Sequence, residues 1–294
     1  MEYTDSALTE IHQLRTHFYQ LALGKDSLLR LMAEAEVPEQ VYDSNAIENS
    51  TLSLDETEKI LRKIDLDRFI SEREMFEARN LARVVEYIHT KAIESELDLD
   101  VMLVLHKMLI SNIRDDIAGR FRTDNEWVRV GNHIAPDPKE VVPRLGKMLA
   151  DLRGQIGAGI IRRVARLHLT FENIHPFVDG NGRIGRVLNN FVLIREGYVP
   201  INIKFIDRDK YYDALREFDT KQTTKLMEKI VELALKNSYH KRITYLAGGE
   251  IIRLVDYAKK YRQSHSNLIN KAHRQTIPAF LERGVWKIAD SYRG

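Results

Sequence analysis

Residues 175–186 read His-Pro-Phe-Val-Asp-Gly-Asn-Gly-Arg-Ile-Gly-Arg, a polar loop that lies between apolar stretches at 160–173 and 184–196. Both stretches repeat their apolar residues with helical spacing. A glycine-rich turn ahead of a helix offers backbone N–H groups and the positive end of the helix dipole, which suits phosphate. The segment therefore predicts a helix–loop–helix whose loop performs chemistry on a polyphosphate.

The second half of the loop carries the expected anion site. Gly180, Asn181 and Gly182 allow a ligand to approach the backbone closely, because no large side chain intervenes. Arg183 and Arg186 are three residues apart, so they share one helix face and can hold adjacent phosphates.

The first half of the loop carries the expected acid–base and metal chemistry. Asp179 lies beside these arginines, and a Mg²⁺ ion that joins it to phosphate oxygens is the simplest reason for a carboxylate there. His175 has the side chain whose ordinary pKa suits a general base near neutral pH. We therefore expect it to remove a proton from an attacking hydroxyl.

Helical signals dominate the rest of the chain. Ser53 with Glu56, and Ser71 with Glu74, have the spacing of capping boxes. Further helices are expected over 101–112, 139–153, 160–173, 184–196, 207–219 and 221–236. Residues 127–134 instead alternate apolar and polar side chains around a Gly-Asn pair, which predicts a short β-hairpin. That hairpin is either a connecting loop or a strand edge for an extended peptide.

The composition is that of an ordinary globular protein, with 44% hydrophobic and 30% charged residues and a net charge of +2. The chain has no cysteine, so disulfides and thiolate metal sites are excluded and a reducing cytoplasm fits. The first residues lack a basic flank followed by an apolar region, and no apolar run is long enough to span a bilayer. These features predict a cytoplasmic protein without membrane contact.

The loop matches the Fic family signature, His-Pro-Phe-x-(Asp/Glu)-Gly-Asn-Gly-Arg-x-x-Arg, at every defined position, and the resemblance extends over roughly residues 40–236. The segment Gly119-Arg120-Phe121-Arg122 resembles the run that precedes the flap of this family. The hairpin residues resemble the flap itself; they are Val130, Gly131, Asn132 and His133. The segment 197–200, followed by Tyr211 and Tyr212, resembles the part that closes the adenine pocket.

The resemblance implies an all-α Fic fold with a short β-hairpin flap and an enzyme that moves AMP from ATP to a Ser, Thr or Tyr hydroxyl of a target protein. It implies that His175 is the base and Asp179 the Mg²⁺ ligand. The anion hole would be residues 180–182, and Arg183 and Arg186 would hold the β- and γ-phosphates. The flap would clamp the target, and self-modification and a homodimer are further expectations from the family.

Two positions refine this comparison. Family members that transfer phosphate tend to have Lys where this chain has Gly182, so Gly182 favours AMP transfer. Many relatives have Asn where an ungapped count reaches Asp219, so the residue that contacts the ribose stays open.

Residues 44–49 form a second motif, Ser-Asn-Ala-Ile-Glu-Asn. By itself it reads as the end of an amphipathic helix with Asn49 as the cap. Beside the Fic loop it resembles the family's inhibitory motif, (Ser/Thr)-x-x-x-Glu-(Gly/Asn), on a helix of about residues 37–49. Ser44 and Glu48 are one helical turn apart, and Glu48 could pair with Arg186 and so divert the γ-phosphate. The alternative is that Glu48 positions a water molecule that removes AMP from the target.

The C-terminal segment differs in charge. Residues 250–294 contain nine Lys and Arg against four Asp and Glu, whereas the remainder is net negative. A helix that includes Ile251, a polar turn, a second helix and a strand that begins at Gly284 resemble a winged helix-turn-helix. It is either a DNA-binding module or a packing module.

We expect three parts: residues 1–100 with the inhibitory helix, the catalytic core at 101–245, and this module. The rival function is a DNA-binding regulator whose Fic site senses nucleotide.

Overall fold

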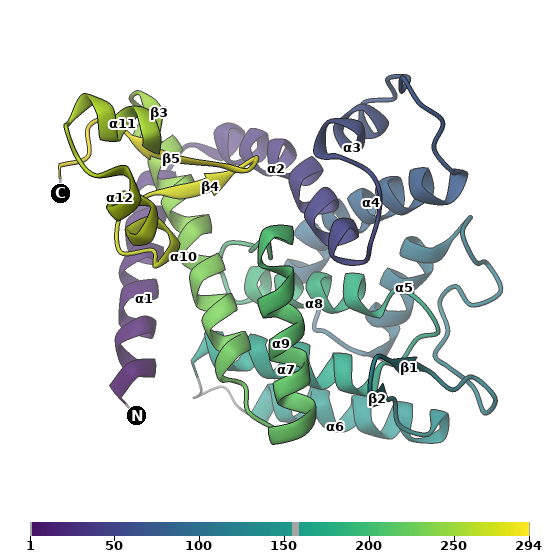
Figure 1. The fold of residues 1–294 in the computed structure, drawn as a ribbon. Helices are drawn as coiled ribbons and strands as arrows, with labels where there is room; N and C mark the ends of the chain where they lie inside the picture. Colours follow the sequence, from purple (N-terminus) through teal and green to yellow (C-terminus); the bar gives the residue numbers. More distant parts are fainter. Residues whose placement is uncertain (1, 155–158, 294) are drawn as a thin grey trace. The chain divides into compact units, whose positions relative to one another are not determined.

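The computed structural model describes residues 2–154 and 159–293, and these residues form a mainly helical protein (Figure 1). Two compact units are present: a larger unit at Val37–Val231, and a smaller unit made of Met1–Glu36 and Glu232–Gly294. The all-α class with small antiparallel sheets is therefore confirmed. The expected three-part division stays a prediction, because compactness within one chain does not establish which parts fold independently. The first and last residues of the expected division, Met1 and Gly294, lie outside the described part of the chain.

The larger unit is built around α8, Asn181–Arg195, whose residues 183–193 are all buried. Its neighbours α7, Ile160–Ile174, and α4, Glu72–Glu94, pack against it. The other helices of this unit are α3 (Leu54–Leu61), α5 (Leu99–Ile110), α6 (Val141–Gly154) and α9 (Arg208–Lys221), with short 3₁₀ turns at Pro138–Glu140 and Phe205–Asp207. Because α8 is enclosed by other helices, the loop that precedes it leaves the core at a fixed position.

Both predicted capping boxes are present. Ser53 caps α3 and Ser71 caps α4; in each box the Glu at the third helical position bonds back to the backbone of the capping serine. Glu74 also accepts a hydrogen bond of 2.6 Å from the hydroxyl of Thr51. The start of α4 therefore holds the segment that follows the motif at residues 44–49.

The predicted hairpin is also present, as β1 (Arg129–Val130) paired antiparallel with β2 (His133–Ile134). Gly131 at its tip has a φ of 59°, a left-handed conformation that glycine adopts at little cost. The hairpin joins no other strand among the described residues.

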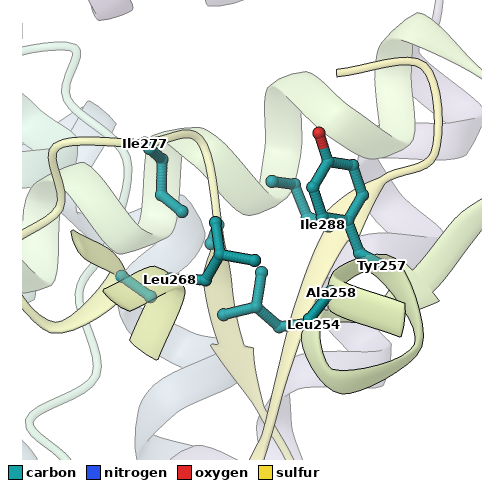
Figure 2. Packing of buried hydrophobic residues seen from close by; sticks show 8 residues of the cluster. Leu254, Tyr257, Ala258, Leu268, Ile277 and Ile288 are labelled. Carbon is teal, nitrogen blue, oxygen red and sulfur yellow. The ribbon is translucent and has the colours of Figure 1, made fainter. Parts of the chain in front are cut away.

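The smaller unit ends in a sheet of order β3-β5-β4 with two short helices. Its elements are α1 (Glu2–Ala22), β3 (Ile251–Arg253), α11 (Leu254–Lys260), α12 (His265–His273), β4 (Phe280–Glu282) and β5 (Val285–Ala289), together with parts of α2 and α10. Leu254, Tyr257, Leu268 and Ile288 pack into one apolar cluster (Figure 2). The expected helix over Ile251 was wrong at that residue, because Ile251 pairs with Ala289 in the sheet.

Two helices differ in length from their predictions. The helix α2 spans Asp26–Ile47, so it begins well before residue 37, runs through Pro38, and ends before Glu48. Buried Val37 and Val41 flank the proline and favour the helix despite the lost backbone hydrogen bond. The helix α10 spans Lys225–Ala247, longer than expected. Within the described ranges, no helix is both long and apolar enough to cross a membrane.

Candidate active site

A cavity of about 630 Å³ lies in the larger unit between the hairpin, α7 and α9. This volume is within the usual range for small-molecule sites. Four predicted site residues line it in addition to His175 and Tyr212; they are Val130, Gly131, Asn132 and His133. Asp219, whose role the sequence left open, lines it as well. His133 anchors the hairpin at the rim, because its Nε2 lies 2.8 Å from the carbonyl of Asn173 and its Nδ1 lies 3.4 Å from Asp219 Oδ1.

His175 ends α7 in a left-handed conformation, with φ of 49° and ψ of 62°. Arg122 holds this unusual backbone, since its Nε donates a hydrogen bond of 2.7 Å to the His175 carbonyl and its own N–H donates to Pro176. The ring Nδ1 lies 3.3 Å from the Glu172 carbonyl. Burial lowers the pKa of His175 to about 4, so the imidazole is neutral and able to accept a proton at physiological pH.

His106 supports the same loop from α5. Its Nδ1 accepts a hydrogen bond of 3.1 Å from the Gly119 N–H, which leaves Nε2 to donate to the Asp179 carbonyl at 3.1 Å. Its ring stacks on Phe177 with centroids 3.8 Å apart. Burial lowers the pKa of His106 to about 4, in agreement with this neutral tautomer. Nothing in the sequence around His106 indicates this role.

The end of the loop is closed by Asn181. Its side-chain amide exchanges two hydrogen bonds of 2.9 Å with the backbone of Phe177. Gly180 precedes α8 with φ of 85°, and no side chain caps this helix end. The first turn of α8 therefore keeps its N–H groups and dipole for an external anion.

Arg186, on α8, joins the two motifs that the sequence singled out. Its Nη2 donates to Glu48 Oε1 at 2.9 Å and to the Ser44 carbonyl at 2.8 Å, while Nε donates to the Ser44 hydroxyl at 2.9 Å. The Arg186 side chain is 8% exposed and that of Glu48 is 35% exposed. Although burial acts to lower it, the Glu48 carboxylate raises the pKa of Arg186 above its usual value.

Behind Arg186 lies a buried polar chain that the sequence did not reveal. Tyr211 is buried rather than part of the cavity wall, and its hydroxyl accepts a hydrogen bond of 3.3 Å from Arg186 Nη1. The same hydroxyl lies 2.9 Å from His168 Nε2. Burial lowers the pKa of His168 to about 3, so the ring is neutral. Its Nδ1 accepts a hydrogen bond of 3.1 Å from Asn189 Nδ2, which leaves Nε2 to donate to the Tyr211 hydroxyl.

Asp179 and Arg183 belong to a second charged group. The Asp179 carboxylate accepts from Arg183 Nη2 at 3.2 Å and from Arg73 Nη2 at 2.9 Å. Although burial acts to raise it, these arginines lower the pKa of Asp179 below its ordinary value. An ionised carboxylate is a ligand for a divalent cation bound jointly with phosphate oxygens, but both oxygens of Asp179 already contact guanidinium groups. Among residues 2–154 and 159–293, no cluster of three metal-binding side chains supplies a complete cation site.

Glu172 is a further buried acid beside the site. Its Oε2 lies 3.8 Å from His175 Nδ1, and its Oε1 has no hydrogen-bond partner in the described structure. Burial, together with the nearby Glu48 carboxylate, raises the pKa of Glu172 to about 8, so the group is largely protonated at pH 7. Nothing in the local sequence distinguishes this glutamate from an ordinary helical one.

Tyr212 and Asn49 hold the end of the motif at residues 44–49. Tyr212 lines the cavity, and its hydroxyl donates to the Ile47 carbonyl at 3.1 Å. Asn49 has a left-handed φ of 68°, and its side chain accepts a hydrogen bond of 2.6 Å from Arg208 Nη2. Glu48 lies in the turn after α2 rather than within the helix, and this turn directs its carboxylate to Arg186.

The fold therefore assembles residues from distant parts of the sequence. His175 and the hairpin face one cavity, Ser44 and Glu48 meet Arg186, and Asp179 pairs with Arg183. Arg73, Glu77, His106, His168 and Glu172 complete these groups, and only the polar identity of each could have hinted at a role.

Comparison with known proteins agrees with the resemblance of the loop to the Fic signature. Residues 96–193 match the Fic/DOC family model. The chain is 28% identical over 214 residues to protein adenylyltransferase Fic of Nematostella vectensis, covering 71% of this chain and 49% of the relative. It is 32% identical over 213 residues to protein adenylyltransferase fic-1 of Caenorhabditis elegans, covering 71% of this chain and 41% of the relative. This chain thus spans less than half the length of these two relatives.

The solved structure of Caenorhabditis elegans Fic-1, residues 134 to 508, superposes with a TM-score of 0.71 at 27% identity. The match covers 81% of this chain and 71% of that chain. The arrangement of helices and the sequence signature thus agree, and the chain carries a Fic/DOC-family domain at residues 96–193.

Proposed function

We propose that this protein is a protein adenylyltransferase that is inhibited by its own Glu48. It transfers AMP from ATP to a Ser, Thr or Tyr hydroxyl of a target protein. The names of its relatives support the reaction. The observation that carries the regulatory part is the 2.9 Å ion pair between Glu48 and Arg186, which joins residues 138 positions apart.

The proposed reaction is a substitution at the α-phosphorus of ATP. The target oxygen forms a bond to that phosphorus, the bond to the oxygen bridging to the β-phosphorus breaks, and pyrophosphate leaves. His175 accepts the hydroxyl proton, which its low pKa permits because the ring is neutral. A Mg²⁺ ion held by Asp179 would neutralise charge on the phosphates. The helix start at residues 180–182, with Arg183 and Arg186, orients the anion.

The hairpin has a separate proposed role as the target clamp. Its two strands have one unpaired edge each among the described residues, and Val130 and Ile134 are exposed. An extended target segment can add to such an edge through main-chain hydrogen bonds. This arrangement would bring a target hydroxyl to the cavity that His175 lines.

Inhibition follows from competition for one guanidinium. While Glu48 and Ser44 occupy Arg186, the γ-phosphate loses its partner and ATP binds without the correct orientation. The variant Glu48→Gly is expected to raise AMP transfer about tenfold or more, since a hydrogen bond between charged groups contributes roughly 1.5–3 kcal/mol. Labelled ATP incubated with the protein and a cell lysate measures the transfer, including self-modification.

Two further variants make this experiment specific. Glu48→Gln keeps the shape without the charge and should give an intermediate rate. His175→Ala in the Glu48→Gly background should abolish labelling. Equal labelling by the wild-type protein and Glu48→Gly would exclude inhibition by Glu48. A Glu48→Gly protein that instead fails to release AMP from a modified target would assign Glu48 to the reverse reaction.

A substitution at Gly182 provides an independent way to break the contact between Glu48 and Arg186. A Cβ atom at this position would overlap Glu48 Oε1, the mobile end of a side chain, so Gly182→Ala should push Glu48 away from Arg186. By calorimetry, we expect Gly182→Ala to change ATP affinity more favourably in the wild-type background than in Glu48→Gly, because only the wild type gains a released Arg186, whereas any crowding of the anion site by the new Cβ is common to both backgrounds. Gly146→Ala is the matched control, because nothing lies within 4 Å of a Cβ there. An equal effect of Gly182→Ala in both backgrounds would contradict this mechanism.

The low pKa of His175 is directly measurable. Because burial favours the neutral ring, protonation should occur only as pH falls through about 4. An ordinary imidazole would be mostly protonated already at pH 5.5. NMR titration of the histidine ring signals, with His175→Ala for assignment, should show no midpoint for this residue between pH 8 and 5. A midpoint between pH 6 and 7 would refute the assignment of a buried neutral base.

We also propose that the smaller unit binds duplex DNA through α12, as a second candidate function. No acidic residue occurs from 257 to 281, a stretch that contains five Lys and Arg, all exposed. On α12 the exposed side chains include Asn267, Asn270 and Lys271, and Arg274 follows directly. Polar and basic groups of this kind contact phosphates and base edges.

The double variant Lys271→Gln, Arg274→Gln tests DNA binding in the full-length chain. The slope of log affinity against log salt concentration should fall by about two, the value for two lost phosphate contacts. The control is Lys139→Gln, Lys147→Gln, which removes two exposed charges from the larger unit. Unchanged binding in the α12 variant, or no retention on duplex DNA by the wild type at 50 mM salt, would exclude this function.

A further inference from the structure

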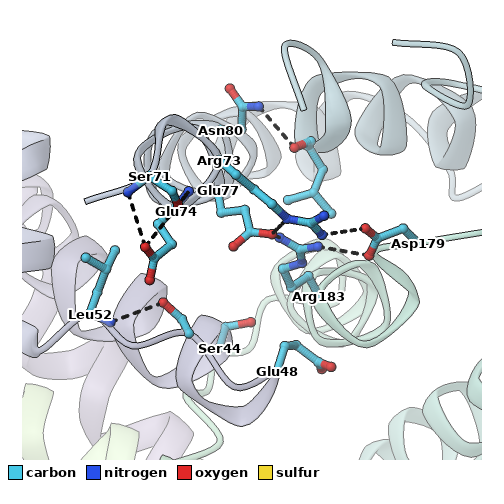
Figure 3. A network of polar contacts seen from close by, with 12 residues as sticks. Ser44, Glu48, Leu52, Ser71, Arg73, Glu74, Glu77, Asn80, Asp179 and Arg183 are labelled. Carbon is cyan, nitrogen blue, oxygen red and sulfur yellow. Dashed lines mark hydrogen bonds and ion pairs between the residues drawn. The ribbon is translucent and has the colours of Figure 1, made fainter. Parts of the chain in front are cut away.

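Four charged side chains form a closed ring at the first turns of α4 and α8 (Figure 3). Arg73 contacts Glu77 Oε1 at 3.1 Å and Asp179 Oδ2 at 2.9 Å. Arg183 contacts the same Glu77 oxygen at 3.3 Å and Asp179 Oδ1 at 3.2 Å. Each arginine therefore binds both carboxylates, and the ring is electrically neutral.

The two arginines of the ring differ in exposure. The side chain of Arg183 is 4% exposed and that of Arg73 is 56% exposed. A buried guanidinium is costly without a carboxylate, so Arg183 stays with Glu77 and Asp179. Arg73 reaches the ring from the solvent side, and its contact with Asp179 is the one that can break at low cost.

Arg73 can release Asp179 without leaving the site. Its Nε remains bound to Glu77, four residues further along the same helix, while only the Nη2 contact with Asp179 needs to open. Glu77 in turn stays on Arg183. Arg73 therefore stays attached to α4 through Glu77, and its guanidinium can either contact Asp179 or lie away from it.

We propose that Arg73 is a displaceable internal cation that occupies Asp179 until a divalent cation arrives with the nucleotide. This inference rests on the proposed function, in which Asp179 is the carboxylate for that cation. Both Asp179 oxygens already contact guanidinium groups, so a metal can gain the Oδ2 atom only when Arg73 moves away. Without the metal, Arg73 keeps Asp179 from repelling the phosphates. Arg73 is thus a positioning residue that makes nucleotide binding depend less on the metal.

The test compares ATP affinity with Mg²⁺ and with EDTA, measured by calorimetry in the Glu48→Gly protein. In Arg73→Gln, metal-free ATP should bind more weakly, because Asp179 loses a neutralising charge. ATP with Mg²⁺ should bind equally well or more tightly, because the metal has no competitor. The ratio of the two affinities should rise about 1.4-fold to fivefold, the range for one exposed ion pair.

Arg68→Gln is the matched control, because Arg68 forms an exposed ion pair with Glu56 just before α4 and does not belong to the ring. It should leave the ratio unchanged, and thermal melting of all variants checks that they fold. Equal weakening with and without Mg²⁺ would make Arg73 an ordinary phosphate contact and overturn the proposal, as would no change in either affinity. Absence of ATP binding in every variant would refute the proposed function itself, and this inference with it.

Discussion

A buried guanidinium requires partners, and the larger unit is arranged around that requirement at Arg186. Its helix, α8, is enclosed by neighbouring helices, so the side chain has little access to water. Ser44 and Glu48 approach it from one side, and Tyr211 approaches from α9. Removal of all these contacts would leave an unpaired buried charge, which costs several kcal/mol. In the proposed function, a phosphate group would replace Glu48 and so avoid that cost.

The loop before α8 is held by a separate set of hydrogen bonds to its backbone. Arg122 binds the carbonyl of His175, His106 binds that of Asp179, and Asn181 binds both backbone groups of Phe177. Each contact fixes the backbone rather than a side chain. The first turn of α8 is thus presented at one position relative to the cavity, which is what charge stabilisation of a transferring phosphoryl group needs.

The charges of the arginines on α8 are balanced by residues that lie outside this helix. Arg186 is matched by Glu48 and Arg183 by Glu77 and Asp179, so both proposed phosphate-binding arginines have acidic partners in the absence of a ligand. Glu172 stays protonated beside them because burial and Glu48 raise its pKa. Binding of a polyphosphate with its cation would therefore replace ion pairs between these arginines and protein carboxylates with ion pairs between the arginines and the phosphates.

Much of the local structure of this protein could be predicted from its sequence, because it depends on short-range interactions. Capping boxes at Ser53 and Ser71, the helical periodicity around the loop, and the hairpin at residues 127–134 all depend on neighbours within a few positions. The strand at Ile251 was missed because its partner, Ala289, is far along the chain. The end of α2 at Ile47, ahead of Glu48, was missed for a related reason: Arg208 and Tyr212 hold that turn.

The sequence by itself determined which chemical groups the loop contains and, by resemblance, which reaction we propose for them. Only the tertiary structure decided which groups meet. It placed Tyr211 under Arg186 rather than in the cavity, and it joined Arg73 and Glu77 to Asp179 and Arg183. These contacts depend on how α4, α8 and α9 pack, and packing is set by the summed burial of many side chains rather than by a local pattern.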